Sequence, residues 1–346
     1  MITAHNFGHT RAGAPATRFR LENCRGAHAD ILDYGGTLQS LCLPCRAGNP
    51  VDVVLGYDDL AGYEGGGAYL GATLGRYANR LCGARYALDG RAVAVSANEG
   101  KNCLHGGFQG FDKRMWQAEI AGDTLLLRLL SLSGEEGFEG DLTVQLSFTL
   151  TEENALRIGY WAQSTAPTAV SLSNHAYFNL KGQGTVLDHL VQILADSYTE
   201  TIGAMQTTGR ILPIGGTALD FASPKLLGRD IENPMLAPTR GFDHNFACQG
   251  QGFRKVAAAY CPATGLAMLL STDAPGLQLY TANFLACPGK GGAAYAPHSA
   301  FCMETQSFPD APNHPRFPTA ILRPGETYET ETAYTFLLAE AFPRMQ

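Results

Sequence analysis

The stretch LTVQLSFTLTEENALRIGY, residues 142–160, decides the fold class of this 346-residue chain. Apolar side chains occupy every second position from Leu142 to Leu150, and after the polar turn at residues 151–154 the alternation resumes and runs to Tyr160. Because successive side chains of a strand point to opposite faces, a period of two indicates β-strands with one buried face. The stretch therefore predicts two strands joined by a short polar turn.

Hairpin signals continue on the amino-terminal side of this stretch. Residues 85–95, RYALDGRAVAV, alternate about Asp89-Gly90, a dipeptide that favours the two-residue turn of a β-hairpin. Residues 116–130 repeat the pattern about a second turn. Three residues of this second hairpin are expected to share one face: Trp116, Ala118 and Ile120.

Strand patterns also dominate the carboxyl-terminal half of the chain. Further strands are expected at residues 170–172, 191–194, 266–271, 277–284, 301–306 and 333–338, and short helices only near residues 58–63 and 225–231. Many strands at hairpin spacing predict an all-β sandwich of two large, twisted sheets. Since no linker, low-complexity stretch or exact repeat divides the sequence, we expect residues 1–346 to form a single domain.

The charge balance of the chain indicates which kinds of binding partner to expect. The net charge is -7 and charged residues make up 16% of the chain, with no run of five or more basic residues. Nucleic acid and anionic membrane surfaces both attract basic patches, so neither is the expected partner. A small neutral ligand fits this composition better.

The amino terminus and the cysteines bear on the compartment. Residues 1–19 lack the apolar core of a signal peptide, and no run approaches the roughly twenty apolar residues of a membrane span. Nine cysteines at scattered spacings, including one isolated CxxC at Cys42 and Cys45, are typical of reduced thiols. We therefore expect a cytoplasmic protein without disulfides.

Two glycine-flanked segments in the first third of the chain carry polar residues suited to a ligand. In GRYANRL, residues 75–81, Asn79 and Arg80 follow an apolar run, and the arginine could donate forked hydrogen bonds to ligand oxygens. In NCLHGG, residues 102–107, the glycines would let a ligand approach His105. Each pattern also fits a structural role, as an arginine capping carbonyls or a histidine hydrogen-bonded within its loop.

Three later segments mix aromatic rings with polar groups. SNHAYFNL, residues 173–180, places His175 near Tyr177, and flat rings beside amides suit the C–H faces and hydroxyls of a sugar. GFDHNF carries Asp243 between phenylalanines, and in GLQLYTANF the side chain of Gln278 shares a strand face with Tyr280. These residues are candidates for sugar binding.

Glu304 lies in the otherwise apolar and hydroxylic run FCMETQ, which a series of proline turns follows. A carboxylate in such a strand either faces water on the outer side of a sheet, the usual position, or lies in a pocket. In a pocket, burial would raise its pKa toward that of a general base. The run alone leaves both positions open.

Other kinds of site find little support in the sequence. His105, His175 and His244 are far apart, with no local pair that would preorganise a zinc site, so no metal is expected. The chain also lacks the G-x-S-x-G elbow of a serine hydrolase and a phosphate-binding P-loop.

Taken together, seven motifs in order resemble the aldose 1-epimerase (galactose mutarotase) family. They are VDVVLGYDDLAGY (51–63), GRYANRL (75–81), NCLHGG (102–107), SNHAYFNL (173–180), FDHNF (242–246), LQLYTANF (277–284) and ETQSFPDAPNHPRFPTAILRPGETY (304–328). The resemblance implies the mutarotase-like supersandwich, with a sugar bound in an open cleft on one sheet. It also implies a free monosaccharide as substrate and no cofactor, and it leaves open whether the protein is a monomer or a homodimer.

The resemblance also implies roles for individual residues. Glu304 matches the general base and His175 the general acid of the family. The sugar-binding positions match Asn79, Arg80, His105, Asp243 and Gln278. The chain departs from the family at Ala176, where many members carry Ser or Thr, and at Tyr77, where Val is frequent; the missing hydroxyl at 176 would affect sugar preference or the tuning of His175.

The implied reaction interconverts the α and β anomers of aldohexoses such as galactose and glucose. A base removes the proton of the C1 hydroxyl, an acid protonates the ring oxygen, and the ring opens and recloses on the other face. We expect a carboxylate near His175 to raise the pKa of the imidazole and the pH profile to be bell-shaped.

Three rival interpretations stay open at this point. A glycoside hydrolase would use Glu304 and Asp243 as a carboxylate pair. A non-catalytic sugar-binding module would need neither Glu304 nor His175. A phosphosugar epimerase of the same superfamily would need extra basic residues at the cleft.

Overall fold

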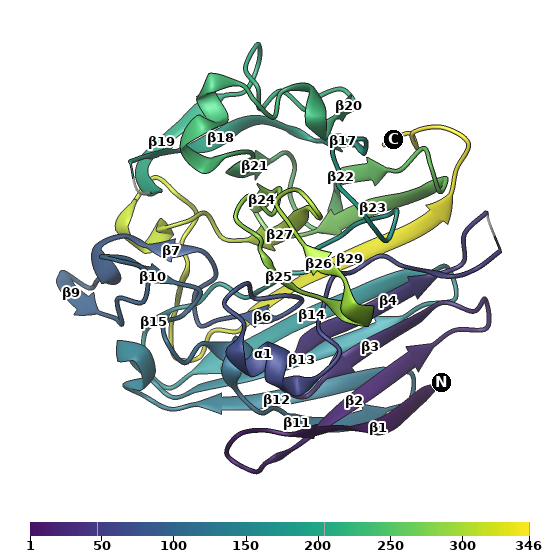
Figure 1. Cartoon of the computed structure of the whole chain (residues 1–346). Coiled ribbons are helices and arrows are strands. Elements are labelled where there is room, and N and C mark those ends of the chain that lie inside the picture. Colours follow the sequence, from purple (N-terminus) through teal and green to yellow (C-terminus); the bar gives the residue numbers. More distant parts are fainter. Residues whose placement is uncertain (47, 204, 346) are drawn as a thin grey trace.

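The alternating arms at residues 142–160 pair with each other within a nine-stranded antiparallel sheet (Figure 1). The computed structural model describes residues 1–46, 48–203 and 205–345. Every alternate residue from Leu142 to Leu150 is buried, as the pattern predicts. In order across the sheet, the strands are β11 (Gln117–Ala121), β12 (Thr124–Ser131), β13 (Leu142–Leu150), β14 (Ala155–Ser164), β29 (Tyr328–Leu338), β23 (Leu266–Thr272), β22 (Arg254–Tyr260), β17 (Leu190–Ile193) and β20 (Lys225–Leu226).

A second layer faces this sheet and consists of two five-stranded sheets. One contains β1 (Ile2–His9), β2 (Pro15–Glu22), β3 (His28–Leu32), β4 (Thr37–Leu43) and β5 (Val51–Asp52). The other contains β19 (Gln206–Pro213), β18 (Ala195–Ile202), β21 (Asp243–Cys248), β24 (Gly276–Tyr280) and β27 (Cys302–Gln306). Phe178 joins them, because it forms isolated antiparallel bridges with Val54 on one side and Phe301 on the other.

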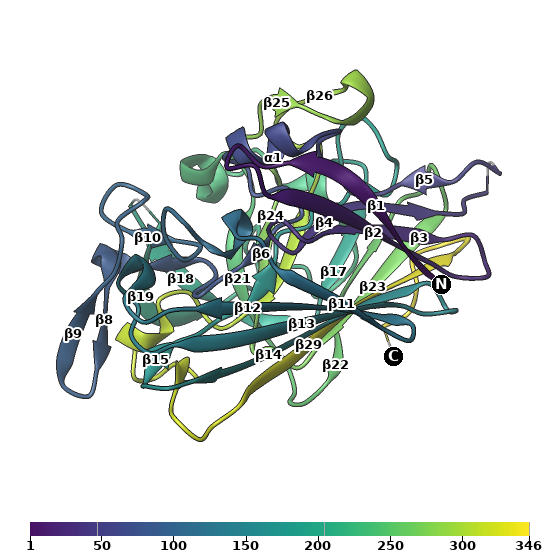
Figure 2. The same cartoon turned by 90° about the horizontal axis from the view of Figure 1, so that it is seen from below.

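The two layers enclose a large apolar core, and Figure 2 shows β1–β4 on one side of it and β12–β14 on the other. Ile31 and Leu38 belong to the same buried cluster as Leu146 and Leu277. Each of these four residues is fully buried, and burying a side chain of this size contributes about 1.5–3 kcal/mol. The all-β sandwich predicted from the alternation is confirmed.

Short elements fill the rest of the described chain. Paired two- to four-residue strands are β6 (Thr73–Leu74) with β16 (Ser173–Asn174), β7 (Arg80–Leu81) with β10 (Cys103–Leu104), β8 (Arg85–Leu88) with β9 (Arg91–Ala94), β15 (Thr168–Ala169) with β28 (Ile321–Leu322) and β25 (Cys287–Pro288) with β26 (Ala294–Tyr295). The 3-10 helices are η1 (Cys82–Ala84), η2 (Phe111–Lys113), η3 (Glu135–Gly137), η4 (Leu227–Arg229), η5 (Pro234–Thr239), η6 (Lys290–Gly292) and η7 (Ala311–Asn313). The α-helix α1 (Leu60–Gly65) begins after Asp59, whose carboxylate caps it by accepting a hydrogen bond from the Gly62 N–H at 2.9 Å.

Several predicted segments differ from the observed ones. Residues 170–172 do not form one strand, because the backbone from 168 to 174 changes partner every few residues, pairing with β28, then Tyr77, then β6. The strand predicted at 277–284 ends at Tyr280, and Ala282 has a left-handed φ of 51°. Residues 225–231, predicted as helical, contain the short strand β20 and the 3-10 helix η4.

The edge of the large sheet gives another correction. Trp116 is buried, but Ala118 and Ile120 are exposed, the latter by 46%. Both lie on β11 at the end of the sheet, and among the described residues this strand pairs with β12 alone. A period of two predicts which residues share one face of a strand, but on an edge strand that face need not be buried.

The structure also describes the cysteines and the lengths of the helices, two features that bear on the expected compartment. All nine cysteines are unpaired. Among the residues that the structure describes, the helices are too short and too polar for any of them to cross a membrane.

Candidate active site

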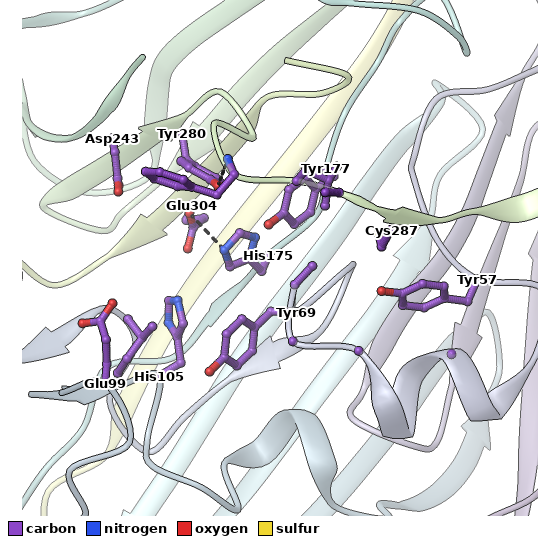
Figure 3. Close-up of a pocket in the computed structure, with 18 of the residues that line it drawn as sticks. Tyr57, Tyr69, Glu99, His105, His175, Tyr177, Asp243, Tyr280, Cys287 and Glu304 are labelled. Carbon is purple, nitrogen blue, oxygen red and sulfur yellow. Dashed lines mark hydrogen bonds and ion pairs between the residues drawn. The ribbon is translucent and has the colours of Figure 1, made fainter. Parts of the chain in front are cut away.

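A cavity of about 670 Å³ opens between α1 and the segment before β25 (Figure 3). The eight residues that the sequence singled out for catalysis or sugar binding all line it: Asn79, Arg80, His105, His175, Tyr177, Asp243, Gln278 and Glu304. They come from strands and loops separated by up to 225 positions, so only the folded sandwich brings them together. The cavity is within the size range of small-molecule sites.

Glu304 lies in the middle of β27, directly opposite Gln278 on β24. It is 2% exposed and lines the cavity, so it does not face water on the outer side of the sheet. Burial raises the pKa of its carboxyl well above the ordinary value, the nearby Asp243 carboxyl raises it further, and the Arg80 guanidinium opposes both. The second carboxyl oxygen is buried without a hydrogen-bond partner among the described residues, which leaves it available to a ligand.

His175 follows β16, and two backbone hydrogen bonds fix its position. Its N–H donates to the Ala72 carbonyl, and its carbonyl accepts from the Gly71 N–H, each at 2.9 Å. The Nε2 atom lies 3.8 Å from Glu304 Oε1, an approach marked in Figure 3. This places an imidazole and a carboxyl at opposite sides of a gap that is too wide for a direct hydrogen bond.

The expected rise in the pKa of His175 is wrong. Burial lowers the pKa of the imidazole to about 4. The physical reason is that Glu304 is buried as well, so its carboxyl favours the neutral form and offers no full negative charge to attract a proton to His175. Both shifts favour the arrangement in which the carboxyl is protonated and the imidazole is neutral.

Aromatic rings surround the imidazole of His175. Tyr177 stacks on it with ring centroids 4.8 Å apart and planes 13° apart, and Tyr69 lies nearly parallel at 6.1 Å and 15°. Tyr280 approaches at 6.2 Å and His105 at 5.4 Å, both close to perpendicular. Tyr177 was predicted to contact sugar, and its ring contacts the histidine. Tyr69 was missed, because it belongs to an irregular segment with a left-handed φ of 56° and no sequence pattern.

His105 is fixed by hydrogen bonds to Asn79. Its N–H donates to the Asn79 carbonyl at 3.0 Å, and its ring Nδ1 accepts from the Asn79 N–H at 3.1 Å. Because Nδ1 accepts a hydrogen bond, the hydrogen of the neutral ring is on Nε2. Burial, with the neighbouring His175 and Arg80, lowers the pKa of His105 well below the ordinary value, so this residue offers the cavity a neutral N–H donor.

The same tautomer bears on metal binding. His105, His175 and Glu304 each offer a ligand atom, and these atoms lie within 4.8 Å of one another. A metal at Nε2 of His105 would require the hydrogen on Nδ1, where it would oppose the Asn79 N–H. The donor set therefore does not fit a metal ion without loss of that hydrogen bond, and we derive no chemistry from one.

Arg80 supplies a positive charge to the cavity and is held by a residue that sequence reasoning missed. Its Nε and Nη2 atoms donate to the two carboxylate oxygens of Glu99, both at 2.7 Å. The Arg80 side chain is 13% exposed, and Glu99 also lines the cavity. The bidentate pair leaves Nη1 for other acceptors, so the structure favours an arginine that faces the cavity over one that caps carbonyls. No local sequence pattern marked Glu99, whose partner Arg80 lies 19 positions away in the chain.

Asp243 and Gln278 form a second polar pair. Gln278 Nε2 donates to Asp243 Oδ1 at 2.5 Å. Burial raises the pKa of Asp243, and the Arg80 charge and the Gln278 hydrogen bond oppose that rise. The second oxygen of Asp243 and the carbonyl of Gln278 can accept hydrogen bonds from hydroxyl groups.

The two departures from the family pattern lie outside the cavity. Ala176 is 1% exposed and packs in the main apolar core rather than at the cavity wall. Tyr77 is also buried, and its hydroxyl donates to the Phe308 carbonyl at 2.9 Å and accepts from the Ala311 N–H at 3.0 Å. Tyr77 thus anchors the proline-rich segment that follows Glu304.

A large antiparallel sandwich whose cavity combines a buried carboxyl, an imidazole, hydrogen-bonding amides and stacked tyrosines defines a carbohydrate-active protein. The family model described as aldose 1-epimerase matches residues 17–335, and the chain belongs to this family. It is therefore an isomerase that interconverts anomers of sugars.

Individual relatives agree with the family. The chain is 39% identical to "Galactose mutarotase" of Rattus norvegicus over 98% of this chain and 99% of that one. It is 37% identical to "Aldose 1-epimerase" of Escherichia coli (strain K12), covering 94% and 96%. Among solved structures, a GalM/aldose epimerase homologue from C. elegans superposes with a TM-score of 0.88 at 31% identity, covering 94% of this chain and 99% of that chain.

Proposed function

We propose that this isomerase acts on free aldohexoses such as galactose and glucose, with Glu304 as general base and His175 as general acid. The observation that carries the proposal is the meeting of these two buried side chains, 3.8 Å apart, inside a cavity otherwise lined by hydrogen-bonding groups and aromatic rings. The names of the relatives, galactose mutarotase among them, support galactose as a substrate.

The reaction needs one proton acceptor and one proton donor at the C1–O5 unit of the sugar. The Glu304 carboxylate takes the proton of the C1 hydroxyl, the C1–O5 bond breaks as the C1 carbonyl forms, and the His175 imidazolium gives its proton to O5. Rotation about C1–C2 then presents the other face of the aldehyde. On closure His175 takes the proton back from the C5 hydroxyl and Glu304 returns one to O1, so nothing is consumed.

The number of protons on the pair stays constant through this cycle. In the ring-closed complex the pair holds one proton, on His175, and after ring opening it still holds one, on Glu304. Burial raises the pKa of Glu304 and lowers that of His175, and both shifts favour the proton on Glu304, which is the arrangement of the open-chain complex. The environment thus favours the protonation state that accompanies the aldehyde, the high-energy form of the sugar.

The remaining cavity residues supply complementary groups for hydroxyls. Arg80 and the Nε2–H of His105 are donors, whereas Asp243 and the Gln278 carbonyl are acceptors. The side chain of Asn79 accepts from the Arg80 N–H at 2.9 Å, so its part is to hold the backbone that carries these donors. Fixed donors and acceptors would keep C1 and O5 at the catalytic pair while the open chain rotates.

Polarimetry tests the proposal directly. Fresh α-D-galactose and α-D-glucose should approach equilibrium rotation faster with the protein than without it. Glu304→Gln should lower the rate of mutarotation by a factor of roughly 10²–10⁴, the usual contribution of a positioned acid or base. Full activity in this variant would exclude Glu304 as the base, and release of nitrophenol from an aryl galactoside would favour a hydrolase.

We also propose that the whole chain works as one domain. The main core cluster contains residues from Phe19 to Phe336 and draws on both layers. A single cooperative unfolding transition, seen alike by circular dichroism and by tryptophan fluorescence, is the expected result. Two separated transitions would contradict it.

A further inference from the structure

His175 must carry a positive charge during part of the proposed cycle, yet it is 5% exposed and lies in an environment that disfavours charge. No hydrogen bond with a neighbouring side chain among the described residues compensates this charge directly. The nearest carboxyl oxygen is 3.8 Å away, and the neighbouring His105 is held neutral by the Asn79 N–H. The Glu304 carboxylate of the ring-closed complex therefore attracts the imidazolium without a hydrogen bond, and the rings packed on His175 are a second feature able to stabilise it.

The rings around His175 are such a feature (Figure 3). Tyr177, Tyr69 and Tyr280, which we call the aromatic cage, have centroids 4.8, 6.1 and 6.2 Å from that of the imidazole. The faces of aromatic rings are electron-rich and attract a cation within about 6 Å, most strongly where water is excluded. The two nearly parallel rings, Tyr177 and Tyr69, lie in different directions from His175 in Figure 3.

We propose that the aromatic cage is the positioning device that stabilises the imidazolium form of His175, with Tyr177 as its principal member. The proposal rests on the proposed function, in which His175 is the acid. It assigns to Tyr177 and Tyr69 a role in the protonation of His175 that is separate from any contact with the sugar.

The cage explains how the acid can be both buried and charged. Burial alone lowers the pKa of His175 to about 4, and stacked rings oppose this effect because they favour the cation over the neutral ring. Five charged or titratable groups face His175 from the surrounding elements: Glu304 on β27, Tyr280 on β24, His105 after β10, Tyr69 and Tyr177. Asp243 and Arg80 affect His175 indirectly, because their charges shift the pKa of Glu304.

Two variants of one residue separate the ring from the hydroxyl. Tyr177→Phe keeps the stacked face, and Tyr177→Leu removes it; both lack the phenolic oxygen. Loss of the ring attraction lowers the pKa of His175, whereas admission of water into the space of the ring would raise it. The direction of the change therefore distinguishes the cage from a merely space-filling tyrosine.

The measurement is the titration of the His175 ring by nitrogen-15 NMR in the ligand-free protein, with the signal assigned by its loss in His175→Asn. We expect a wild-type midpoint above about 4, the same midpoint in Tyr177→Phe, and a proton affinity roughly 3- to 30-fold lower in Tyr177→Leu. An unchanged or raised midpoint in Tyr177→Leu would overturn the proposal.

Two further variants guard against a trivial outcome. Tyr69→Leu should shift the midpoint in the same direction and is safer for folding, because Tyr69 is only partly buried. Tyr86→Leu removes a buried tyrosine that stacks on Phe138 outside the cavity, and it should leave the His175 titration unchanged. A shift of equal size in Tyr86→Leu would refute a local effect of the cage.

Kinetics then separate this proposal from the proposed function. If His175 is the acid, kcat of Tyr177→Leu should fall below that of Tyr177→Phe by a similar factor, with less difference in KM. A lowered proton affinity with equal kcat in the two variants would support the cage and refute the role of His175 as the acid.

Discussion

Replacement of Glu304 by glutamine should lower the rate of mutarotation roughly 10²–10⁴-fold and, above the pH at which a free carboxyl ionises, make the protein more stable. Glu304 is 2% exposed, and burial raises the pKa of its carboxyl well above the ordinary value. In the unfolded chain the same carboxyl ionises near its ordinary pKa of about 4.3. Between these two values folding requires the carboxyl to take up a proton, so wild-type stability falls as the pH rises.

Glutamine has nearly the same shape and does not titrate, so the variant escapes this dependence. The sign follows from linkage: a raised folded-state pKa gives stability that is fully present below the unfolded pKa and is lost as the pH rises through the folded one. The difference in free energy of unfolding between variant and wild type should grow by about 1.4 kcal/mol per pH unit over that window, and level off above it.

The assay is urea denaturation of both proteins at a series of pH values between 4 and 9, followed by circular dichroism. Because all other titrating groups are shared, the difference between the two curves reports the titration of Glu304 together with its effect on the neighbouring His175. A variant that is less stable than wild type at pH 8 would refute the reasoning, since it would mean that the folded protein stabilises the Glu304 carboxylate rather than penalising it.

Three further predictions follow from the same geometry. His175→Asn should lower kcat more than sugar affinity, and an unchanged kcat in polarimetry would transfer the acid role to another residue. The profile of kcat against pH, corrected for spontaneous mutarotation, should be bell-shaped, because activity needs one proton on the pair of His175 and Glu304. The rate falls at low pH, below the ordinary imidazole range, when both groups are protonated, and it falls at high pH when both are deprotonated. Glu99→Gln, which breaks the bidentate pair with Arg80, should raise KM for galactose roughly 10-fold while kcat changes little. The matched control is Glu331→Gln, which breaks an exposed bidentate pair of 2.6 and 2.9 Å with Arg157 on the large sheet and should leave KM unchanged. Equal effects of the two substitutions on KM would contradict the positioning role of Glu99.

Much of the candidate site could be found from the sequence, because its motifs are local. His105 stands before two glycines, His175 between an asparagine and aromatics, and Glu304 at the start of a proline-rich segment. Glu99 and Tyr69 carried no such pattern. They act through partners that are distant in the sequence or on irregular backbone, and pattern reasoning has no access to either.

The protonation of the pair was the clearest failure of sequence reasoning. Proximity of a carboxylate predicted a raised pKa for His175, but the pKa is lowered to about 4. The sign depends on how completely water is excluded from both groups, and exclusion of water is a property of the assembled cavity rather than of any motif.

By itself, the sequence determined the all-β sandwich and the family, because alternation with a period of two over residues 142–160 allows only strands with one buried face, and because seven motifs occur in order. The direction in which Glu304 points, the stacking of Tyr177 on His175 and the proton distribution of the catalytic pair were decided only by tertiary structure. The physical reason is that each depends on contacts between segments far apart in the chain and on the exclusion of water that their packing produces.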